Sequence, residues 1–358
     1  MKIIVFGSSG ILGRLILTQV RSQFGDESAI MSDYDRGRAE STTNSLQLKT
    51  NPRIIDVHDL SSIRSNLDHV DAAIIATKQH EPLLQHECIT RGIVTVDVTV
   101  FQAFVQQVQT FHHLAQQYAV PTLVMAGYFP GLSGIAVHHL INSFDVPHEI
   151  DVSLLQHSQG SSGKYGFVDM LRILQSEIPV NTGKLKGFTA KKAFYHHDYQ
   201  TEFTQYRIHS DEADILNDVF HVDVKYYTGW ENKYFNHLIK FLNRTGLSHV
   251  LVNHPLGQKL ASLLHPPKAY EKTHQENTSL TITGRGQCNG ESVEKTVYIN
   301  AKADYLATAI AATTMLRLIL EKREQFKGGI FLPYQLFDLK MLKEHMLSSE
   351  IDIIGINA

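Results

Sequence analysis

The most informative run in the sequence is Val5-Phe6-Gly7-Ser8-Ser9-Gly10-Ile11-Leu12-Gly13-Arg14, which has the spacing GxxGxxG. It lies between an apolar segment that predicts a buried strand and a segment that predicts a helix. In such a turn Gly7 permits the tight bend, Gly10 lets the backbone approach a pyrophosphate, and Gly13 lets the helix pack on the strand. The helix N-terminus then offers free N–H groups to the phosphates. The predicted dinucleotide contacts in this turn are Gly7, Ser8, Ser9, Gly10, Ile11, Leu12 and Gly13.

A glycine-rich turn of some other α/β protein is the competing interpretation of this motif. The context favours a dinucleotide, because a strand precedes the turn, a helix follows it, and further strands and helices continue the pattern. Ser9 occupies the place of the second glycine of the form GxGxxG, so the motif by itself does not fix the cofactor.

Strands and helices alternate through about the first 130 residues. Strands are expected at residues 3–6, 29–32, 53–57, 71–77, 94–98 and 122–126. Helices are expected at residues 12–23, 82–91 and 104–117, with a shorter one ending at residue 67. Because the strands are continuously apolar, the pattern predicts a doubly wound parallel sheet covered on both faces. Residues 1–130 are therefore expected to form a Rossmann domain.

The pattern changes after Ala126, where signals of antiparallel pairing appear. A helix is expected at residues 130–141, and strands at 149–155, 279–284 and 295–301. Asn289-Gly290, between the last two strands, is typical of a tight hairpin turn. A long Ala-rich helix is expected at residues 303–321. The predicted fold class is α/β: the Rossmann sheet, then an α+β domain over residues 131–302 with a mostly antiparallel sheet.

The composition excludes several classes of protein. A net charge of −3 over 358 residues provides no field that would attract nucleic acid or an anionic membrane. The two cysteines, Cys88 and Cys288, cannot build a disulfide framework or a cysteine zinc site, and they are typical of a reducing compartment. The longest apolar run, Tyr305 to Leu320, is short of a membrane span. We expect a cytoplasmic protein that binds neither nucleic acid nor membranes.

Histidines are numerous, with 20 in the chain. Pairs such as His112-His113 point about 100° apart on a helix, so one pair cannot chelate a metal as histidines at i and i+4 do. The sequence has no HExxH motif, and no metal site is expected. His157 or His209 is a candidate proton donor instead.

The choice between NAD and NADP depends on the end of the second predicted strand. Asp33 lies about 20 residues after Gly13, a spacing typical of a carboxylate that binds the ribose 2′-hydroxyl of NAD. Arg36 and Arg38 follow closely, and either could neutralise the 2′-phosphate of NADP. A solvated charged loop is the alternative, so NADP or NAD both stay open. The predicted contacts here are Asp33, Tyr34, Asp35, Arg36 and Asp56, the last suited to adenine or to a turn cap.

Several further segments resemble one enzyme family. They are GSSGILGR at residues 7–14, Cys88-Ile89-Thr90-Arg91-Gly92, Val96-Asp97-Val98-Thr99 and Gly127-Tyr128-Phe129-Pro130-Gly131-Leu132-Ser133. Together they resemble the saccharopine dehydrogenase (saccharopine reductase)-like family. The resemblance implies NAD(P)-dependent chemistry at a C–N bond, through an imine that is reduced by hydride. It also implies that the tail, residues 303–358, returns to the first domain, and that the second domain forms a homodimer. Lys78 and Tyr334 depart from the family pattern, which leaves the substrate open.

The position of the strand ends predicts the rest of the site, since ligands of a doubly wound sheet bind outside the carboxyl ends of its strands. The cofactor contacts expected there are Ala76, Thr77, Thr99, Pro130 and Gly131. Lys78 is the catalytic candidate, because it could anchor a substrate carboxylate or donate a proton; a solvated surface lysine is the alternative. The expected substrate contacts are Tyr128, Lys164, Tyr165 and Trp230. For Lys164 and Tyr165 the alternative is a surface loop, and for Trp230 a buried anchor.

The leading hypothesis is hydride transfer at the C–N bond of a small, amino-acid-derived substrate. Reduction of a C=O or C=C bond is a second hypothesis within enzymes. A non-catalytic dinucleotide-binding protein is the hypothesis from another class, because no single residue in the sequence is an indispensable catalyst.

Overall fold

The architecture was taken from a computed structural model that describes residues 1–161, 166–180, 183–254, 257, 276–346 and 348–355. The chain forms two compact units. The first combines Met1–Leu132 with Tyr305–Ser348, and the second combines Ser133–Asp304 with Ser349–Ala358.

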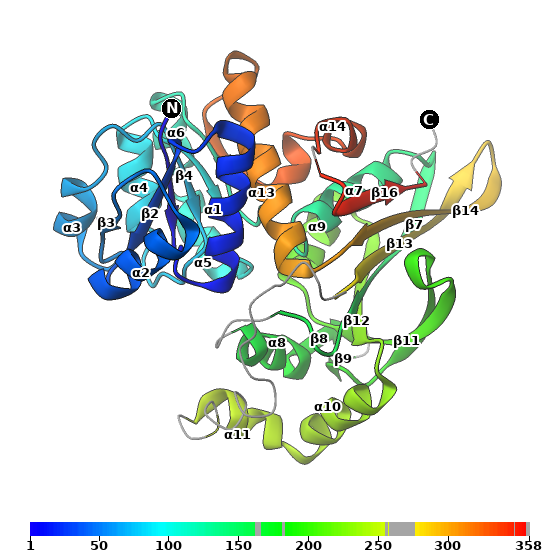
Figure 1. Ribbon diagram of the computed structural model, residues 1–358. Coiled ribbons are helices and arrows are strands. Elements are labelled where there is room, and N and C mark those ends of the chain that lie inside the picture. Colours follow the sequence, from blue (N-terminus) through cyan, green and yellow to red (C-terminus); the bar gives the residue numbers. More distant parts are fainter. Residues whose placement is uncertain (162–165, 181–182, 255–256, 258–275, 347, 356–358) are drawn as a thin grey trace. The chain divides into compact units, whose positions relative to one another are not determined.

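The first unit contains a seven-stranded parallel sheet (Figure 1). Its strands are β1 (Ile3–Phe6), β2 (Ala29–Asp33), β3 (Arg53–Ile54), β4 (Ala72–Ile75), β5 (Val94–Asp97), β6 (Pro121–Leu123) and β15 (Gly329–Phe331). Their order is β15-β6-β5-β4-β1-β2-β3, so the chain moves outward from β1 in one direction and then outward from β4 in the other. Every residue of β1, β4 and β5 is buried, as expected of a parallel sheet covered on both faces. The predicted doubly wound sheet is confirmed.

Helices connect these strands. They are α1 (Ile11–Phe24), α2 (Arg36–Leu46), α3 (Leu60–Ser65), α4 (Leu83–Thr90), α5 (Gln102–Gln109), α6 (His112–Gln117), α13 (Asp304–Glu321) and α14 (Leu339–His345). The core under α3 and α4 joins Ile4 and Ile75 of the sheet to Ile63 of α3 and Leu84 of α4. Burial of each such side chain contributes about 1.5–3 kcal/mol.

One expectation for the helices of the first unit was wrong, and one helix was not predicted. Residues 104–117 form two helices, because the N–H groups of Thr110 and Phe111 bond to carbonyls three residues back, at Gln107 and Val108, and end α5. Helix α2 was not expected at all, because its sequence RGRAESTTNSL has no apolar stripe. Asp35 caps this helix by accepting a hydrogen bond from the N–H of Arg38, at 2.8 Å.

The second unit contains another seven-stranded sheet, in the order β10-β11-β12-β7-β13-β14-β16. Its strands are β7 (Val146–Gln156), β10 (Lys191–His196), β11 (Thr201–Ile208), β12 (Asp223–Trp230), β13 (Thr278–Cys288), β14 (Glu291–Ala301) and β16 (Ile351–Ile354). All neighbours in it are antiparallel except β12 and β7. The unit also holds the hairpin of β8 (Glu177–Val180) with β9 (Gly183–Lys186), and the helices α7 (Leu132–Ile141), α8 (Gly166–Gln175), α9 (Asp211–Phe220), α10 (Lys233–Thr245) and α11 (Leu247–Asn253).

The predicted hairpin turn is confirmed. Cys288 of β13 pairs with Glu291 of β14 across a two-residue loop. Asn289 and Gly290 have φ angles of 52° and 81°, and the primed turns that suit the twist of paired strands require such values. The tail departs from expectation in its last strand: β15 pairs with β6 of the first sheet, but β16 pairs with β14 of the second. The tail therefore contributes a strand to each sheet and does not return wholly to the first domain.

Polar side chains fill part of the interior of the second sheet. His196 of β10 is fully buried, and its ring nitrogens lie 3.4 Å from Ser153 Oγ, 3.4 Å from Gln205 Nε2 and 3.3 Å from Thr281 Oγ1. The sheet curls so far that edge strand β10 reaches β13. This contact is shown by the hydrogen bond that Thr281 Oγ1 donates to the carbonyl of Tyr195 at 2.9 Å. Burial lowers the pKa of His196 to about 3, so this imidazole is neutral at physiological pH.

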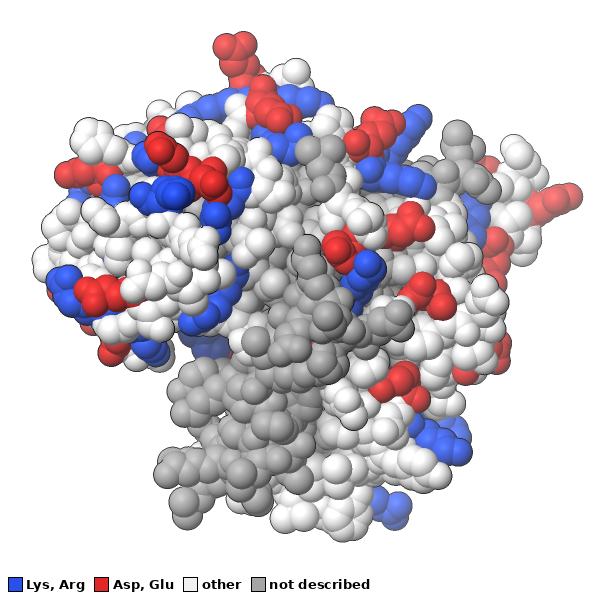
Figure 2. All heavy atoms as spheres, viewed as in Figure 1, with Lys and Arg blue, Asp and Glu red and all other residues white. Residues whose placement is uncertain are grey.

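The exposed charges are mixed in sign. On the face shown in Figure 2, acidic and basic side chains are interspersed. Among the helices in the described ranges, none is both long enough and apolar enough to cross a membrane.

Candidate dinucleotide-binding site

The glycine turn lies between β1 and α1, as the sequence predicts. Gly10 occupies the N-cap position of α1 and has no side chain that could cap the helix, so the first N–H groups of α1 are left for a ligand. The turn is closed by the N–H of Gly10, which donates to the carbonyl of Gly7 at 3.1 Å.

The turn is too tightly packed for side chains at two of its glycines. A Cβ on Gly13 would lie 2.2 Å from the carbonyl oxygen of Gly7 and 2.5 Å from Cα of Ser8. Gly7 has a φ of +77°, and a Cβ there would lie 2.5 Å from the carbonyl oxygen of Ala76. Ala76 and Thr77, two predicted cofactor contacts, are therefore packed directly against the glycine turn.

Ser8 and Ser9 have different surroundings. The buried hydroxyl of Ser8 donates to the carbonyl of Val5 at 2.5 Å and accepts from the N–H of Ser32 at 2.8 Å. It fastens the turn to β2, which leaves only the backbone of Ser8 for a ligand. The hydroxyl of Ser9 donates to the carboxylate of Asp33. Ile11 and Leu12 form the first turn of α1 and are partly buried.

Asp33 closes β2 at the position that the sequence predicts, and it is the centre of a small polar network. Besides Ser9, its carboxylate accepts hydrogen bonds from the N–H of Asp35 at 2.8 Å and from Nη2 of Arg38 at 2.7 Å. The guanidinium of Arg38 lies 4.5 Å over the ring of Tyr34, which is itself exposed. The network places one buried carboxylate and one cation beside the glycine turn.

The other charged candidates in this region have local structural roles. Asp35 caps α2, and Arg36 extends into solvent beside Glu40, with their charged atoms 3.8 Å apart. Asp56 was expected to end the third strand, but β3 ends at Ile54. Its carboxylate accepts from the N–H of His58 at 2.9 Å, so Asp56 is a turn cap, the alternative that the sequence left open.

The loops after β4 and β5 form the next part of the same sheet edge. Lys78 is exposed in the loop after β4. Thr99 follows β5, and its N–H donates to Oδ1 of Asp97 at 2.8 Å, while the side chain of Gln85 donates to Oδ2 at 2.6 Å. Asp97 has no exposed surface, and this burial raises its pKa to about 6. The Gln85–Asp97 pair was not predicted from the sequence.

A stability prediction follows from the burial of Asp97. Its folded pKa of about 6 is above the ordinary value of 3.8, so its contribution to stability is complete below pH 3.8 and is lost as the pH rises through 6. The loss amounts to roughly 3 kcal/mol. Asp97→Asn removes the titration, and the new amide can pair with the side chain of Gln85. In urea titrations we expect the variant to exceed the wild type in free energy of unfolding at pH 8 and to equal it at pH 4. The same difference at both pH values would contradict the assignment.

The segment after β6 closes on itself. The N–H of Gly127 donates to the carbonyl of Pro130 at 3.1 Å, and the N–H of Leu132 donates to the carbonyl of Gly127 at 2.9 Å. Tyr128 is buried, and its N–H donates to Oγ1 of Thr308 on α13 at 3.3 Å. Pro130 and Gly131 thus belong to a compact loop at the carboxyl end of the sheet, before α7 begins.

The candidates of the second unit are less informative. Trp230 is buried with its ring against Phe188 and Phe235, so it is a core anchor, the alternative that the sequence left open. Lys164 and Tyr165 lie outside the described residues. His157 lies 3.8 Å from Glu231, and His209 lies 3.0 Å from Asp214. A hydrogen bond with Asp214 raises the pKa of His209.

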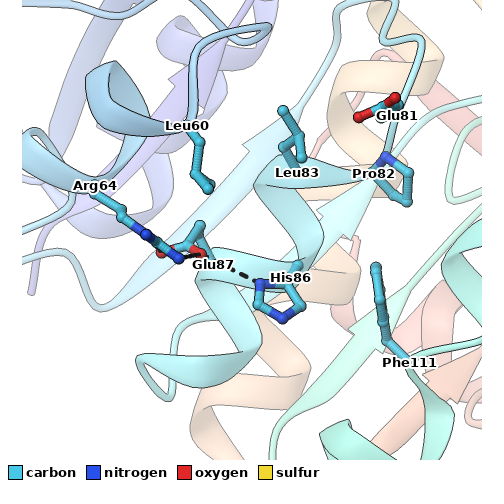
Figure 3. A pocket seen from close by; sticks show the side chains of 8 residues that line it. All are labelled: Leu60, Arg64, Glu81, Pro82, Leu83, His86, Glu87 and Phe111. Atoms are coloured by element: carbon cyan, nitrogen blue, oxygen red, sulfur yellow. Dashed lines mark hydrogen bonds and ion pairs between the residues drawn. The ribbon is translucent and has the colours of Figure 1, made fainter.

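A pocket of about 360 Å³ opens between α3 and α4 (Figure 3). Its lining residues are Leu60, Arg64, Glu81, Pro82, Leu83, His86, Glu87 and Phe111. The buried Glu87 accepts two hydrogen bonds from Arg64, at 3.0 and 3.1 Å, which hold its pKa below the usual range. The ion pair satisfies the charges of Arg64 and Glu87, and Glu81 and His86 add polar groups to the wall of the pocket. No pattern in the sequence predicts this pocket.

Comparisons with known proteins show which fold this is. No family model and no curated protein matches the chain in sequence. Among solved structures, saccharopine dehydrogenase (L-Glu forming) from Saccharomyces cerevisiae is similar with a TM-score of 0.67 at 11% identity, covering 99% of each chain. Homospermidine synthase from Legionella pneumophila, solved in complex with NAD, has a TM-score of 0.67 at 10% identity, covering 99% of this chain and 91% of that one. The chain therefore has a saccharopine dehydrogenase-like fold, which the quoted motifs had led us to expect.

Proposed function

We propose that this protein is an NAD(P)-dependent oxidoreductase that transfers hydride at the C–N bond of an amino-acid-derived substrate. The observation that carries the proposal is the turn around Gly13, where neither Gly7 nor Gly13 has room for a Cβ and the N-terminus of α1 is left open. Backbone N–H groups in that arrangement suit a pyrophosphate. The fold supports the proposal, since the homospermidine synthase that shares it was solved with NAD.

Hydride transfer to an imine needs no covalent bond between the substrate and the protein. A bound reduced nicotinamide would supply hydride to an imine carbon, and the imine nitrogen must then gain a proton. The glycine turn would position the dinucleotide, and Asp33 would orient its adenosine ribose. Lys78, exposed beyond β4, is the proposed anchor for a substrate carboxylate or source of the proton.

We further infer that the site prefers NAD to NADP. Asp33 is a buried carboxylate that can accept a hydrogen bond from a ribose 2′-hydroxyl, whereas a 2′-phosphate would meet its negative charge. The cation nearest to it, Arg38, is already paired with that carboxylate at 2.7 Å. Asp33→Ala removes the repulsion and frees Arg38. We expect the ratio of NADPH to NADH affinity to rise by about tenfold or more, measured by fluorescence titration.

Asp35→Ser is the matched control for this specificity change. It removes a carboxylate two residues away, yet serine can still cap α2, so the preference should not change. Equal shifts in both variants would mean that the general charge of the loop, and not Asp33, decides between the cofactors.

Turnover tests the function itself. Purified full-length protein is incubated with NADH or NADPH and pairs of an amino acid or amine with a keto acid or aldehyde, and the loss of absorbance at 340 nm is followed. Consumption with one such pair is expected, and the KM of Lys78→Gln tests the proposed carboxylate anchor. Consumption only with isolated ketones or with C=C substrates would favour the second enzymatic hypothesis. Binding without any turnover would favour a non-catalytic dinucleotide-binding protein.

A homodimer and a cytoplasmic location belong to the same proposal. The dimer is implied by the family resemblance, and the location by the two cysteines of the chain. Light scattering distinguishes a dimer from the monomer mass of 40.3 kDa, and a result at the monomer mass would remove the dimer from the proposal. Cell fractionation tests the location.

A further inference from the structure

The loop after β4 contains a glutamine whose amide is buried without a partner. Both Oε1 and Nε2 of Gln79 are shielded from solvent, and neither forms a hydrogen bond with any part of the chain that the structure describes. Buried amides are nearly always paired, and an unpaired one costs about 1–3 kcal/mol. The side chain of Gln79 therefore offers one donor and one acceptor, side by side, to something beyond these residues.

The neighbours of Gln79 place it at the dinucleotide site. Two residues before it, Thr77 is packed against Gly7: a Cβ added to Gly7 would lie 3.0 Å from Cβ of Thr77. One residue after it, the imidazole of His80 lies 5.1 Å from that of His58, with 32° between the rings. His58 belongs to the loop after β3, in the turn that Asp56 caps. The loop of Gln79, which follows β4, thus contacts the glycine turn at one end and the loop after β3 at the other.

That end of a doubly wound sheet is the adenosine half of the crevice. On its N7 edge adenine presents the 6-amino donor beside the N7 acceptor, and a glutamine amide can satisfy both at once. Planar rings are the second element of base recognition, because every base has a face that stacks on an aromatic side chain. His58 and His80 are both exposed, so a base can pack on this pair.

We propose that Gln79, with the paired rings of His58 and His80, forms an adenine-recognition site that reads the edge of the base carrying the 6-amino group and N7. The inference rests on the proposed function, since the adenine belongs to the proposed dinucleotide. It goes beyond that function because a site that only held the pyrophosphate and the ribose would tolerate other purines. The expected ligand class is an adenine dinucleotide, and the site should reject its hypoxanthine counterpart, in which a carbonyl oxygen replaces the amino group.

The test compares NADH with reduced nicotinamide hypoxanthine dinucleotide in fluorescence titrations of the full-length protein. Wild-type protein should bind NADH about tenfold more tightly, because hypoxanthine presents two acceptors, O6 and N7, on that edge, and in either orientation of the Gln79 amide Oε1 would face one of them. Gln79→Ala should bind both dinucleotides with similar affinity, close to that of the wild type for the hypoxanthine form. Gln117→Ala, on the exposed end of α6, is the matched control and should keep the full preference.

Each outcome bears on a separate claim. If the wild type binds both dinucleotides equally, or if Gln79→Ala keeps the preference, the adenine site is wrong while the proposed function stands. If the wild type binds neither dinucleotide, the proposed function fails first. A second variant guards against loss of folding: Gln79→Glu keeps an acceptor for the amino group but loses the donor, so it should retain part of the preference.

Discussion

Gly13→Ala is expected to lower the affinity for NADH by about two orders of magnitude. An added Cβ would lie 2.2 Å from the carbonyl oxygen of Gly7 and 2.5 Å from Cα of Ser8, and both of these are backbone atoms of the turn itself. Neither can move unless the turn opens, which displaces the N–H groups that would bind the pyrophosphate. Overpacking of this kind also costs about 1–3 kcal/mol of stability. Isothermal titration with NADH measures the affinity, and urea titration measures the stability.

Gly37→Ala is the matched control for this variant. Gly37 is also helical, in α2, but the nearest atom to its added Cβ is Oδ1 of Asp35 at 3.4 Å, an ordinary contact. Helix propensity alone favours alanine over glycine by about 1 kcal/mol, so this variant should be as stable as the wild type or slightly more so. Its NADH affinity should not change. Wild-type affinity in Gly13→Ala would show that the glycine turn does not bind the dinucleotide.

Acidification is expected to destabilise the second unit through His196. Burial lowers the folded pKa of His196 to about 3 from an ordinary 6.5, so its contribution is complete above pH 6.5 and is lost as the pH falls through 3. The loss is about 1.4 kcal/mol per pH unit and roughly 5 kcal/mol in total. His196→Gln removes this titration, because its amide can hydrogen bond with Ser153 or Thr281 but does not take up a proton.

Trp230 provides the readout for the second unit. It is the single tryptophan of the chain and is buried there, so its fluorescence in urea titrations reports on that unit. Between pH 7.5 and 5 the wild type should lose about 2 kcal/mol more than His196→Gln in free energy of unfolding. Parallel losses in the two proteins would mean that the imidazole is not buried as described.

His196 and Asp97 titrate in opposite directions. Stability from His196 rises with pH between 3 and 6.5, whereas stability from Asp97 falls with pH between 3.8 and 6. The two effects partly cancel in the total free energy of unfolding. Comparison of each variant with the wild type separates them, since His196 belongs to the second unit and Asp97 to the first.

The sequence predicts most of the first sheet, because its signals are local. A glycine turn between an apolar strand and a helix specifies its own geometry, and Asn289-Gly290 does the same for the hairpin of β13 and β14. Helix α2 was missed because its face is polar, although the cap at Asp35 was a visible signal. Strand β16 was not predicted, because its pairing with β14 is a long-range choice that no local pattern specifies.

The candidate site was predictable only in the part whose positions follow from the backbone geometry of the glycine turn and its motif. Gly7, Gly13 and Asp33 stand at positions that the motif fixes, and the structure brings Ala76 against the turn. The inward hydroxyl of Ser8 and the capping role of Asp56 depend on partners that are chosen by the tertiary fold. For the same reason no pattern in the sequence marks Gln79, whose buried amide becomes apparent only when the loop after β4 is in place.

The central claim is that the turn at residues 7–13 binds a nicotinamide dinucleotide. Isothermal titration of the purified full-length protein with NADH, with ADP-ribose as competitor, tests it most directly. We expect one NADH to bind per chain with a Kd in the micromolar range and to be displaced by ADP-ribose. The absence of binding by either NADH or NADPH at millimolar concentration would contradict it, and the oxidoreductase proposal would then have to be abandoned.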